Sequence, residues 1–313
     1  MTQNLPEVAC IVVNRDGGDS LFAAIRSLRA QVEIDLSILV VDNDSDPRER
    51  ERLAREAPEA RVVAFSRNLG FAGAANEGIA RTRSPLVLLL NNDAVLSPDY
   101  VCRLAARLGL DDRLAGAQGL VLTKDGSRVD SAGILWSARG EALPVLGDRE
   151  TATAPHAAFE VAGISATAAL YRREALESVA AHGEIFDPAF FAYYEDADLS
   201  LRLARKGWRF VCDPAAVARH EGSRTGRRTP LRRAIWTARN RWRTLYRNFD
   251  EVLLHRSFGS LLRADLAHAR QLGWKGALLL LSVWPRILSD VWRHRGETSR
   301  LRVWPASVSA DDR

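Results

Sequence analysis

The sequence predicts an α/β fold in which helices cover both faces of a parallel sheet, followed by a second, helical region. Residues 86–90 are an unbroken apolar run, which is typical of a strand buried on both faces. Strand and helix patterns alternate four times within the first ninety residues, as in a doubly wound sheet. After about residue 228 the chain becomes basic and rich in tryptophan, which marks the second region.

The elements of the first half follow from the spacing of apolar residues and from the turns between them. Apolar runs predict strands at 8–13, 36–41, 61–65 and 86–90, and helical spacing predicts helices at 20–30 and 48–56 and through Asn76 to Ile79. Neither a Gly-x-Gly-x-x-Gly motif after the first strand nor a Gly-x-x-x-x-Gly-Lys-Ser/Thr motif is present. The usual dinucleotide-binding fold is therefore disfavoured, and the P-loop fold is excluded.

The pattern becomes less regular between residues 114 and 161. Short strand-like segments at 119–122 and 133–136 lie among turns, and residues 149–155 have the composition of a loop. The stretch 159–171 is apolar and small, and a helix follows from Arg173 or Glu174. Helical spacing then predicts a helix from Glu195 to near Gly207, followed by a strand at 208–212.

The bulk composition describes an ordinary globular protein. With 313 residues, of which 47% are apolar and 27% charged, the chain suits one large domain or one domain with an appendage. Cys10, Cys102 and Cys212 share no metal-ligand spacing, and we expect reduced core thiols in a cytosolic protein. No secretory signal is visible. The apolar stretch 277–281 is far shorter than the about 20 residues of a membrane span.

Charge is distributed unevenly along the chain. Residues 221–313 contain 19 Lys and Arg against 8 Asp and Glu, a net charge of +11. Because the whole chain carries +5, the first 220 residues carry −6. Six of the eight tryptophans also lie in the basic region. The two regions are therefore expected to do different work.

Two acidic groups stand at positions where a ligand could bind. Asn91, Asn92 and Asp93 follow the apolar strand directly, and the carboxyl end of such a strand is where ligands bind in open α/β sheets. Glu195, Asp196 and Asp198 fall in the first turn of a predicted helix, after an aromatic segment that would partly desolvate them. Each group also has a purely structural reading, as a turn or a helix cap.

A third candidate is His220, which precedes a Gly/Ser loop rich in arginine. A single histidine is more often an ordinary residue than a ligand. The loop, which includes Arg227, could wrap a pyrophosphate, because guanidinium groups match phosphate oxygens bidentately.

Taken in order, these segments resemble the family 2 glycosyltransferases with the GT-A fold, especially the bacterial rhamnosyltransferase-like branch. The likeness spans about residues 8–228 and is weaker around Asn240. It rests on segments 41–46, 68–76, 89–93 and 191–199, and on Gly207-Trp208 with His220 at the expected distance. The resemblance implies a Rossmann-like, mixed but mostly parallel sheet. It also implies a catalytic domain at 1–228, with a nucleotide-binding half to about 95 and an acceptor half at 96–228, before a basic, Trp-rich helical region at 229–313.

The resemblance implies a role for each candidate residue. Asp42 would accept the N3–H of a uracil or thymine ring, Asn14 and Asn68 would line the nucleoside pocket, and Gly70 would let the backbone approach the ligand closely. Asp196 would be the general base that deprotonates the acceptor hydroxyl. Glu195, Asp198 and Tyr194 would support the base or the acceptor. The other residues assigned to the nucleotide are Asn76, Asn92 and Arg227.

The resemblance further implies a divalent cation, Mg²⁺ or Mn²⁺, that bridges the donor diphosphate. Asp93 and His220 would be ligands, and Asn91 stands where many relatives carry the first aspartate of an Asp-x-Asp motif. Because an amide oxygen is a weaker ligand than a carboxylate, we expect low metal affinity until the nucleotide supplies phosphate oxygens.

The basic region has three readings. Trp and Arg mixed along helices expected at 231–248, 257–269 and 273–292 suit a bilayer interface. The same mixture could bind RNA, or the tryptophans could pack on the catalytic domain. We favour peripheral attachment to the inner face of the cell membrane, because a polyprenyl-diphosphate-linked acceptor would be found there.

The function expected from the resemblance is inverting, metal-dependent transfer of a sugar from a dTDP- or UDP-sugar to a glycan acceptor in cell-surface polysaccharide synthesis. The first choice of donor is dTDP-rhamnose. The alternatives are a UDP-hexose, UDP-N-acetylhexosamine or UDP-galactofuranose donor, an inactive sugar-nucleotide-binding module, and a nucleic-acid adaptor. The presence of Asp196, Asp93 and His220 disfavours the inactive module, and no nucleic-acid partner is expected. The sequence does not predict an oligomeric state.

Overall fold

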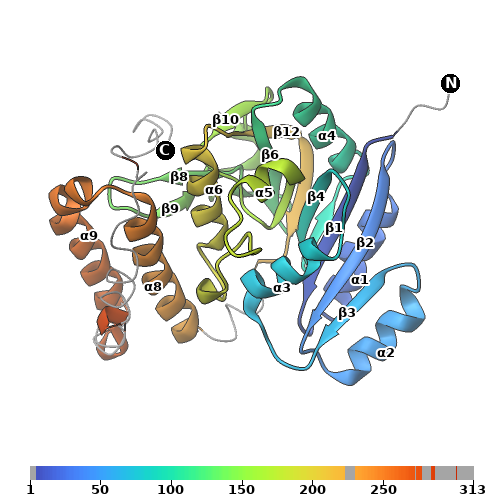
Figure 1. Ribbon diagram of the computed structural model, residues 1–313, viewed down its shortest axis with the longest axis horizontal. Coiled ribbons are helices and arrows are strands. Elements are labelled where there is room, and N and C mark those ends of the chain that lie inside the picture. Colours follow the sequence, from blue (N-terminus) through green and yellow to red (C-terminus); the bar gives the residue numbers. More distant parts are fainter. Residues whose placement is uncertain (1–4, 223–229, 272, 277–282, 286–300, 302–313) are drawn as a thin grey trace.

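The computed structural model describes residues 5–222, 230–271, 273–276, 283–285 and 301 (Figure 1). Its centre is a ten-stranded mixed sheet, in which eight strands follow the order β10-β12-β6-β11-β4-β1-β2-β3 while β5 pairs with β12 and β7 with β6. The strands of the nucleotide-binding half are β1 (Glu7–Asn14), β2 (Asp35–Asn43), β3 (Arg61–Phe65) and β4 (Leu86–Asn91). All four are parallel to their neighbours within this half, as predicted.

The sheet becomes mixed on the other side of β4. Strand β11 (Ala168–Arg172) is antiparallel to both β4 and β6 (Leu114–Thr123), and β12 (Arg209–His220) runs parallel to β6. The mixed, mostly parallel sheet expected from the resemblance is therefore confirmed. The remaining strands are short: β5 (Ala94–Leu96), β7 (Val129–Ser131), β8 (Ile134–Trp136), β9 (Ala142–Pro144) and β10 (Phe159–Val161).

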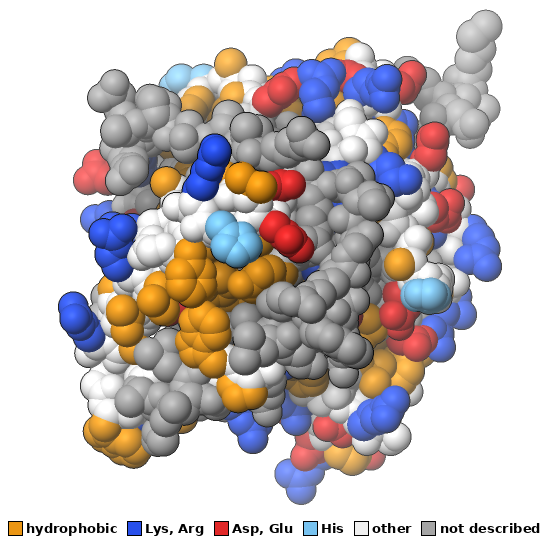
Figure 2. All heavy atoms as spheres, turned by 60° about the vertical axis from the view of Figure 1, so that its left-hand side comes forward, with side chains coloured by type: hydrophobic (Ala, Val, Ile, Leu, Met, Phe, Trp, Pro, Cys, Tyr) orange, Lys and Arg blue, Asp and Glu red, His pale blue; other side chains and the backbone are white. Residues whose placement is uncertain are grey.

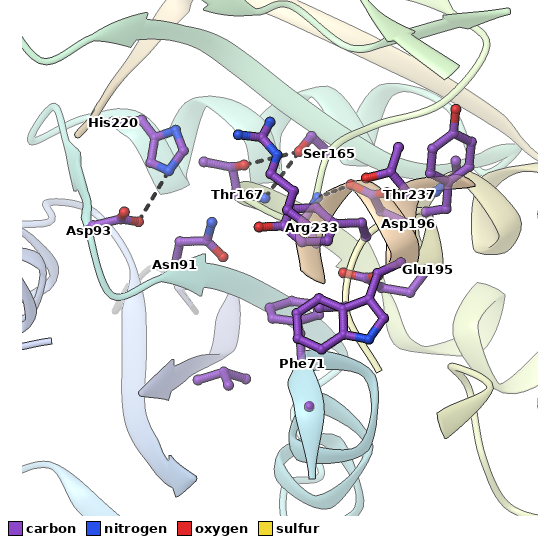
Figure 3. Close-up of a pocket in the computed structure, with 18 of the residues that line it drawn as sticks. Phe71, Asn91, Asp93, Ser165, Thr167, Glu195, Asp196, His220, Arg233 and Thr237 are labelled. Atoms are coloured by element: carbon purple, nitrogen blue, oxygen red, sulfur yellow. Dashed lines mark hydrogen bonds and ion pairs between the residues drawn. The ribbon is translucent and has the colours of Figure 1, made fainter. Parts of the chain in front are cut away.

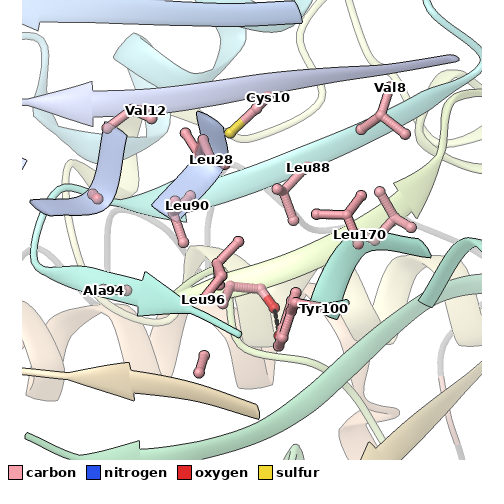
Figure 4. Close-up of a cluster of buried hydrophobic side chains, with 14 of the residues drawn as sticks. Val8, Cys10, Val12, Leu28, Leu88, Leu90, Ala94, Leu96, Tyr100 and Leu170 are labelled. Carbon is pink, nitrogen blue, oxygen red and sulfur yellow. Dashed lines mark hydrogen bonds between the residues drawn. The ribbon is translucent and has the colours of Figure 1, made fainter. Parts of the chain in front are cut away.

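Helices cover both faces of the sheet, because alternate residues of each strand point to opposite sides. On one face, Val8, Cys10 and Val12 of β1 pack in a cluster with α1 (Asp19–Arg29) and α4 (Tyr100–Leu110) (Figure 4). On the other face, Ile11 packs in a cluster with α3 (Gly70–Ala80), α5 (Arg173–Ser178) and α6 (Glu195–Arg205). Helix α2 (Pro47–Glu56) contributes only Leu53 to the first cluster.

The sequence underestimated two central strands. Strand β6 was expected only at 119–122, because its glycines lower the strand signal. A Cβ at Gly119 would lie 2.2 Å from the Ala216 carbonyl oxygen, so the close approach of β12 requires glycine there. Strand β12 was expected to end at Cys212, but a register shift between Asp213 and Val217 accommodates Pro214 and lets the strand continue.

The basic region begins with two long helices, α8 (Pro230–Asn248) and α9 (Glu251–Gln271), that lie on the side of the molecule away from β3 (Figure 1). Helix α8 packs on α6, and Trp242, Leu245 and Leu261 share a buried cluster with Trp136. The expected helices at 231–248 and 257–269 are thus present, whereas most of the one expected at 273–292 lies outside the described residues.

The tryptophans of the basic region do not share one environment. Trp242 is 1% exposed and stacks with Tyr246, whereas Trp274 is 72% exposed. The interpretation in which the tryptophans pack on the catalytic domain therefore holds for Trp242. Within the described ranges, no helix is both long enough and apolar enough to cross a bilayer.

Candidate active site

One cleft of about 830 Å³ opens at the carboxyl ends of the central strands (Figure 3). Asp93, which follows β4, and Asp196, in the first turn of α6, both line it although they are more than a hundred residues apart in sequence. The strand ends supply Asn91, Asn92 and His220 to the same cleft, and the first turns of α8 close one side. The two predicted acidic groups therefore face a shared space.

At one end of the cleft His220 lies between two carboxylates. Its Nε2 is 3.1 Å from Asp93 Oδ1, and its Nδ1 is 2.9 Å from Asp130 Oδ2. Burial opposes the charged imidazolium, but hydrogen bonds to Asp130 and Asp93 outweigh burial and raise the pKa of His220 to about 9. In the metal-free protein His220 is therefore a cation at neutral pH.

These residues fit a divalent cation in part. Within the described residues, no group of three or more His, Cys, Asp or Glu side chains has the arrangement of a metal site. Asp93 and His220 are adjacent and Asn91 lines the same cleft, so the protein offers at most a few ligands there. A hard cation needs about six oxygen ligands, and a nucleotide diphosphate would have to supply several of them.

We predict that the affinity of this site for Mn²⁺ rises with pH up to about pH 9. His220 must lose its proton before it can be a ligand, and its pKa is about 9. If one proton is released for each ion bound, the apparent affinity rises about tenfold per pH unit below that value. Titration with Mn²⁺ in the presence of dTDP or UDP between pH 6.5 and 8.5 measures the slope. The variant His220→Gln should flatten it, and a pH-independent affinity in the unaltered protein would contradict the prediction.

At the other end of the cleft, two adjacent acids differ in their contacts. Asp196 Oδ2 accepts a hydrogen bond from the Ala166 amide (3.3 Å), and Oδ1 accepts one from the Ala197 amide (2.8 Å). Burial raises the pKa of Asp196, while these amides and the Ser165 hydroxyl act against the increase. Burial and then the charge of Asp196 raise the pKa of Glu195 to about 8. At pH 7 Glu195 is therefore mostly protonated, and the pair carries less than two negative charges.

The aromatic segment before these acids has a strained backbone. Phe191, Tyr193 and Tyr194 have backbone φ angles of 65°, 70° and 71°. Residues other than glycine seldom adopt this region. The segment is held from α8, where the Nδ2 atom of the fully buried Asn240 lies 2.8, 2.9 and 2.8 Å from the carbonyl oxygens of Phe190, Ala192 and Tyr193. Helix α8 of the basic region therefore holds the loop that directly precedes Glu195 and Asp196.

Tyr194 and Asp198 were also predicted to support Asp196, and the structure places them in different environments. Tyr194 lines the cleft, and its hydroxyl accepts a hydrogen bond from the Ala142 amide. Asp198 does not line the cleft. It is 1% exposed, and Arg247 and Arg202 hold its pKa low against the effect of burial. Asn248 also donates to its Oδ1, so Asp198 joins α6 to α8 instead of facing an acceptor.

Two predicted nucleotide residues support the cleft from behind. Asn14 is fully buried and does not line the cleft, but its Oδ1 accepts a hydrogen bond (2.8 Å) from Asn92, which does. Asp42 is also fully buried, with Arg50 Nε 3.5 Å from one carboxylate oxygen. Burial raises its pKa more than Ser45 and Arg50 lower it. A buried, poorly compensated carboxylate is costly, and Asp42 is not among the described residues that line the cleft.

Asn68 and Gly70 line the cleft, and the neighbouring Asn43 arranges them. Asn43 Nδ2 donates to Asn68 Oδ1 (3.0 Å) and to the Gly70 carbonyl, while its Oδ1 accepts from the Leu69 amide. Gly70 has φ +73°, and a Cβ there would lie 2.3 Å from the Phe191 carbonyl oxygen. The glycine is therefore required by contact with the strained loop, whatever it does for a ligand.

Asn76, another nucleotide candidate, does not line the cleft. Asn76 Nδ2 donates to the Phe186 carbonyl (2.7 Å), and its Oδ1 accepts from the Ile185 and Phe186 amides. Its side chain ties α3 to the segment before the aromatic loop. Arg227 lies outside the described residues.

Sequence reasoning missed several residues that line the cleft. Asp130 comes from the irregular region, where no pattern pointed to a site, and Ser165 is one of many small residues between strands. Arg233 and Trp236 were noted only as part of a basic helix, although both face the cleft. Asn43, which also lines the cleft, could have been predicted from the sequence, because it ends the same strand as Asp42 and ligands bind at the carboxyl ends of such strands.

Comparisons with known proteins agree with this architecture. The family model described as glycosyl transferase family 2 matches residues 8–180. The chain is 31% identical over 252 residues to the N-acetylglucosaminyl-diphospho-decaprenol L-rhamnosyltransferase of Mycobacterium tuberculosis, covering 72% of this chain and 79% of that one. It is also 30% identical over 152 residues to the succinoglycan biosynthesis protein ExoO of Rhizobium meliloti, covering 48% and 40% of the two chains.

Solved structures share the fold at low sequence identity. The mannosyltransferase PcManGT of Pyrobaculum calidifontis, in complex with GDP-Man and Mn²⁺, has a TM-score of 0.56 and 15% identity, covering 95% of this chain and 89% of that one. TarS of S. aureus has a TM-score of 0.57 and 13% identity, covering 91% and 81%. The fold is thus GT-A, and the chain belongs to glycosyl transferase family 2, in its rhamnosyltransferase-like branch, and is a glycosyltransferase.

Proposed function

We propose that this glycosyltransferase transfers rhamnose from dTDP-rhamnose, with inversion, to a polyprenyl-diphosphate-linked glycan. The observation that carries the proposal is that Asp196 and the Asp93–His220 pair line one cleft. The Mycobacterium tuberculosis relative is named for L-rhamnosyl transfer to an N-acetylglucosaminyl-diphospho-decaprenol, which supports both the sugar and the class of acceptor. A product of this kind belongs to cell-surface polysaccharide synthesis.

Asp196 is assigned the role of general base. The more exposed of the two adjacent acids, it lines the cleft and would accept the proton of the acceptor hydroxyl as the oxygen attacks the anomeric carbon. Attack in line with the departing diphosphate inverts the anomeric configuration. Protonated Glu195 keeps a second negative charge away from the incoming hydroxyl oxygen, which itself becomes more negative as it reacts.

Asp93 and His220, with Asn91, are assigned to a divalent cation held jointly with the donor diphosphate. When bound, the cation would supply positive charge to the leaving nucleoside diphosphate. The nucleoside would lie against Asn68, Gly70 and Asn92 at the ends of the parallel strands. Asn14 and Asn43 would hold these residues in place through the hydrogen bonds described above.

The proposal is tested by a thermal-shift panel of dTDP-rhamnose, UDP-glucose, UDP-galactofuranose and UDP-N-acetylglucosamine, each with and without Mn²⁺. A ligand that binds only the native protein raises its melting temperature, by an amount that grows with its affinity. We expect the largest shift with dTDP-rhamnose and Mn²⁺. A larger shift with a UDP-sugar would identify that UDP-sugar as the donor in place of dTDP-rhamnose. No shift with any of the four would overturn the assignment of the cleft to a nucleotide sugar.

We further propose that the enzyme is cytoplasmic and attaches to the inner face of the cell membrane through α9. The exposed side of this helix combines apolar Val252 and Leu266 with Arg256, Arg263 and Arg270. Figure 2 shows the side of the molecule that carries α8 and α9, where a patch of apolar side chains is exposed, with Lys and Arg side chains toward one edge and acidic side chains beside it. This combination suits a bilayer that contains anionic lipid.

Reversing the charge of Arg256, Arg263 and Arg270 together is expected to lower binding to anionic liposomes by about 100-fold or more, because each basic residue near such a surface contributes about 1 kcal/mol. Flotation with and without anionic lipid measures the loss. Reversal of three exposed arginines on α1 and α2 (Arg26, Arg48 and Arg55) is the matched control. Equal binding by the two triple variants would contradict the assignment of the membrane-facing side.

A further inference from the structure

The first turns of α8 present one polar and aromatic face to the cleft. Arg232, Arg233, Trp236 and Thr237 all line it, and their spacing places them on the same side of the helix. Figure 3 shows Arg233 pointing into the cleft that also contains Asp93, His220 and Asp196. The start of the basic region is therefore part of the binding surface.

The arginines farther along α8 are engaged by the protein itself. Arg239 donates to the Ala189 and Phe190 carbonyl oxygens, Arg241 pairs with Asp265, and Arg247 pairs with Asp187 at 2.7 Å. In these contacts the guanidinium groups donate to other parts of the protein and hold α8 in place.

Arg232 and Arg233 differ from these arginines. Among the described residues, neither has a carboxylate within the 4.0 Å of an ion pair. The Arg233 guanidinium lies over the Tyr193 ring, 5.5 Å from its centroid, a contact that orients the side chain, and no hydrogen bond to another described residue uses its N–H donors. Two arginines at the edge of a ligand cleft thus retain donors for a ligand.

The charges and surfaces around them indicate which ligand. Acidic side chains line other parts of the cleft, so an anionic group that enters it is held best at the two arginines. Each guanidinium can bind phosphate oxygens through two parallel hydrogen bonds. Beside them, Trp236 packs on Phe191 with ring centroids 4.9 Å apart, which offers an apolar surface next to the cations.

We propose that Arg232 and Arg233 form a diphosphate-binding subsite on α8. Two diphosphates have the required chemistry, that of the nucleotide donor and that of a polyprenyl-linked acceptor. This subsite rests on the proposed function for the identity of those two ligands, but its binding chemistry can be measured without turnover. It also gives α8 a role in ligand binding that is independent of the membrane.

The test measures binding of dTDP, UDP and farnesyl diphosphate by calorimetry in buffer containing EDTA, so that no metal contributes. The double variant Arg232→Gln/Arg233→Gln is compared with the unaltered protein and with Arg48→Gln, an exposed arginine on α2. Loss of charge-assisted hydrogen bonds is expected to weaken diphosphate binding by about 10- to 100-fold. Farnesol is the probe without phosphate, and its binding should not change. Glutamine keeps the helix propensity and both sites are exposed, and melting curves verify that the variants are folded.

The pattern of loss identifies the source of the diphosphate. Weaker binding of dTDP and UDP alone assigns the subsite to the donor, and weaker binding of farnesyl diphosphate alone assigns it to the acceptor. Equal affinity of the double variant and Arg48→Gln for all three probes would overturn the proposal, as would absence of diphosphate binding by the unaltered protein. The proposed function fails on a different result, namely that none of the four nucleotide sugars stabilises the unaltered protein in the presence of Mn²⁺, so the two can fail separately.

Discussion

Replacing Asp196 by asparagine is expected to lower the rate of sugar transfer by about 10²- to 10⁴-fold, the usual contribution of a general base. The amide has nearly the same shape and can still accept the hydrogen bond from Ala166, but it cannot take a proton at neutral pH. Because Asp196 lies at the opposite end of the cleft from Asp93 and His220, the affinity for the nucleotide donor should stay the same (Figure 3). Single-turnover rates and donor titration measure the two quantities separately.

Glu195→Gln is the matched control, and it should behave very differently at pH 7. Because burial and Asp196 raise the pKa of Glu195 to about 8, this side chain is mostly protonated at pH 7 and glutamine imitates that form. We expect a rate within about threefold of the unaltered enzyme, since no charged group is lost. The pH–rate profile should change more than the rate, because the titration near pH 8 disappears when Glu195 is absent.

The pair of variants distinguishes two assignments of the base. If Glu195→Gln abolishes transfer at pH 7 while Asp196→Asn retains it, Glu195 is the base and Asp196 only raises its pKa. If both variants retain the rate, neither carboxylate removes the proton.

The sequence predicted the parts of the fold whose signal is local. The apolar runs that became β1, β2, β3 and β4 are continuous because parallel strands are buried on both faces. Strand β6 was largely missed because of its glycines, of which Gly119 lies against the backbone of β12 and Gly116 against that of β11, segments far away in the sequence. Strand propensity cannot report a requirement of that kind, because the cause lies in tertiary packing.

The residues of the cleft likewise divide into those with a local sequence signal and those whose position depends on tertiary packing. Asp93 was found because the end of a buried strand is visible in the sequence, and Asp196 because acids cluster before an apolar helical stripe. In contrast, Asp198 shares that cluster but faces Arg202 and Arg247 on the other side of α6. Without the position of α8, the sequence offered no means of separating the acid that lines the cleft from the one that joins two helices.

Asn240 illustrates a residue whose importance depends wholly on the tertiary structure, and its replacement by alanine should impair both stability and catalysis. The change removes the hydrogen bonds to three carbonyl oxygens in the loop that precedes the acids. The Phe190 carbonyl keeps donors from Arg239 and the Ala192 amide. Loss of the hydrogen bonds to the Ala192 and Tyr193 carbonyls, together with the cavity left by the side chain, should lower the free energy of unfolding by about 2–4 kcal/mol. The strained φ angles of this loop persist only while its surroundings hold them, so the loop should relax.

Relaxation of the loop would displace Glu195 and Asp196, which follow it directly, so we expect kcat to fall by at least tenfold at a temperature where the variant is still folded. Asn248→Ala is the matched control, because Asn248 is an equally buried amide on α8 that donates to Asp198 and to the Thr244 carbonyl without touching the loop. Both variants should melt at lower temperature, but only Asn240→Ala should lose kcat with donor affinity retained. Equal kcat in the two variants would show that the loop keeps its geometry without Asn240. The fall in kcat, rather than in melting temperature, is the result that would identify α8 as part of the catalytic machinery.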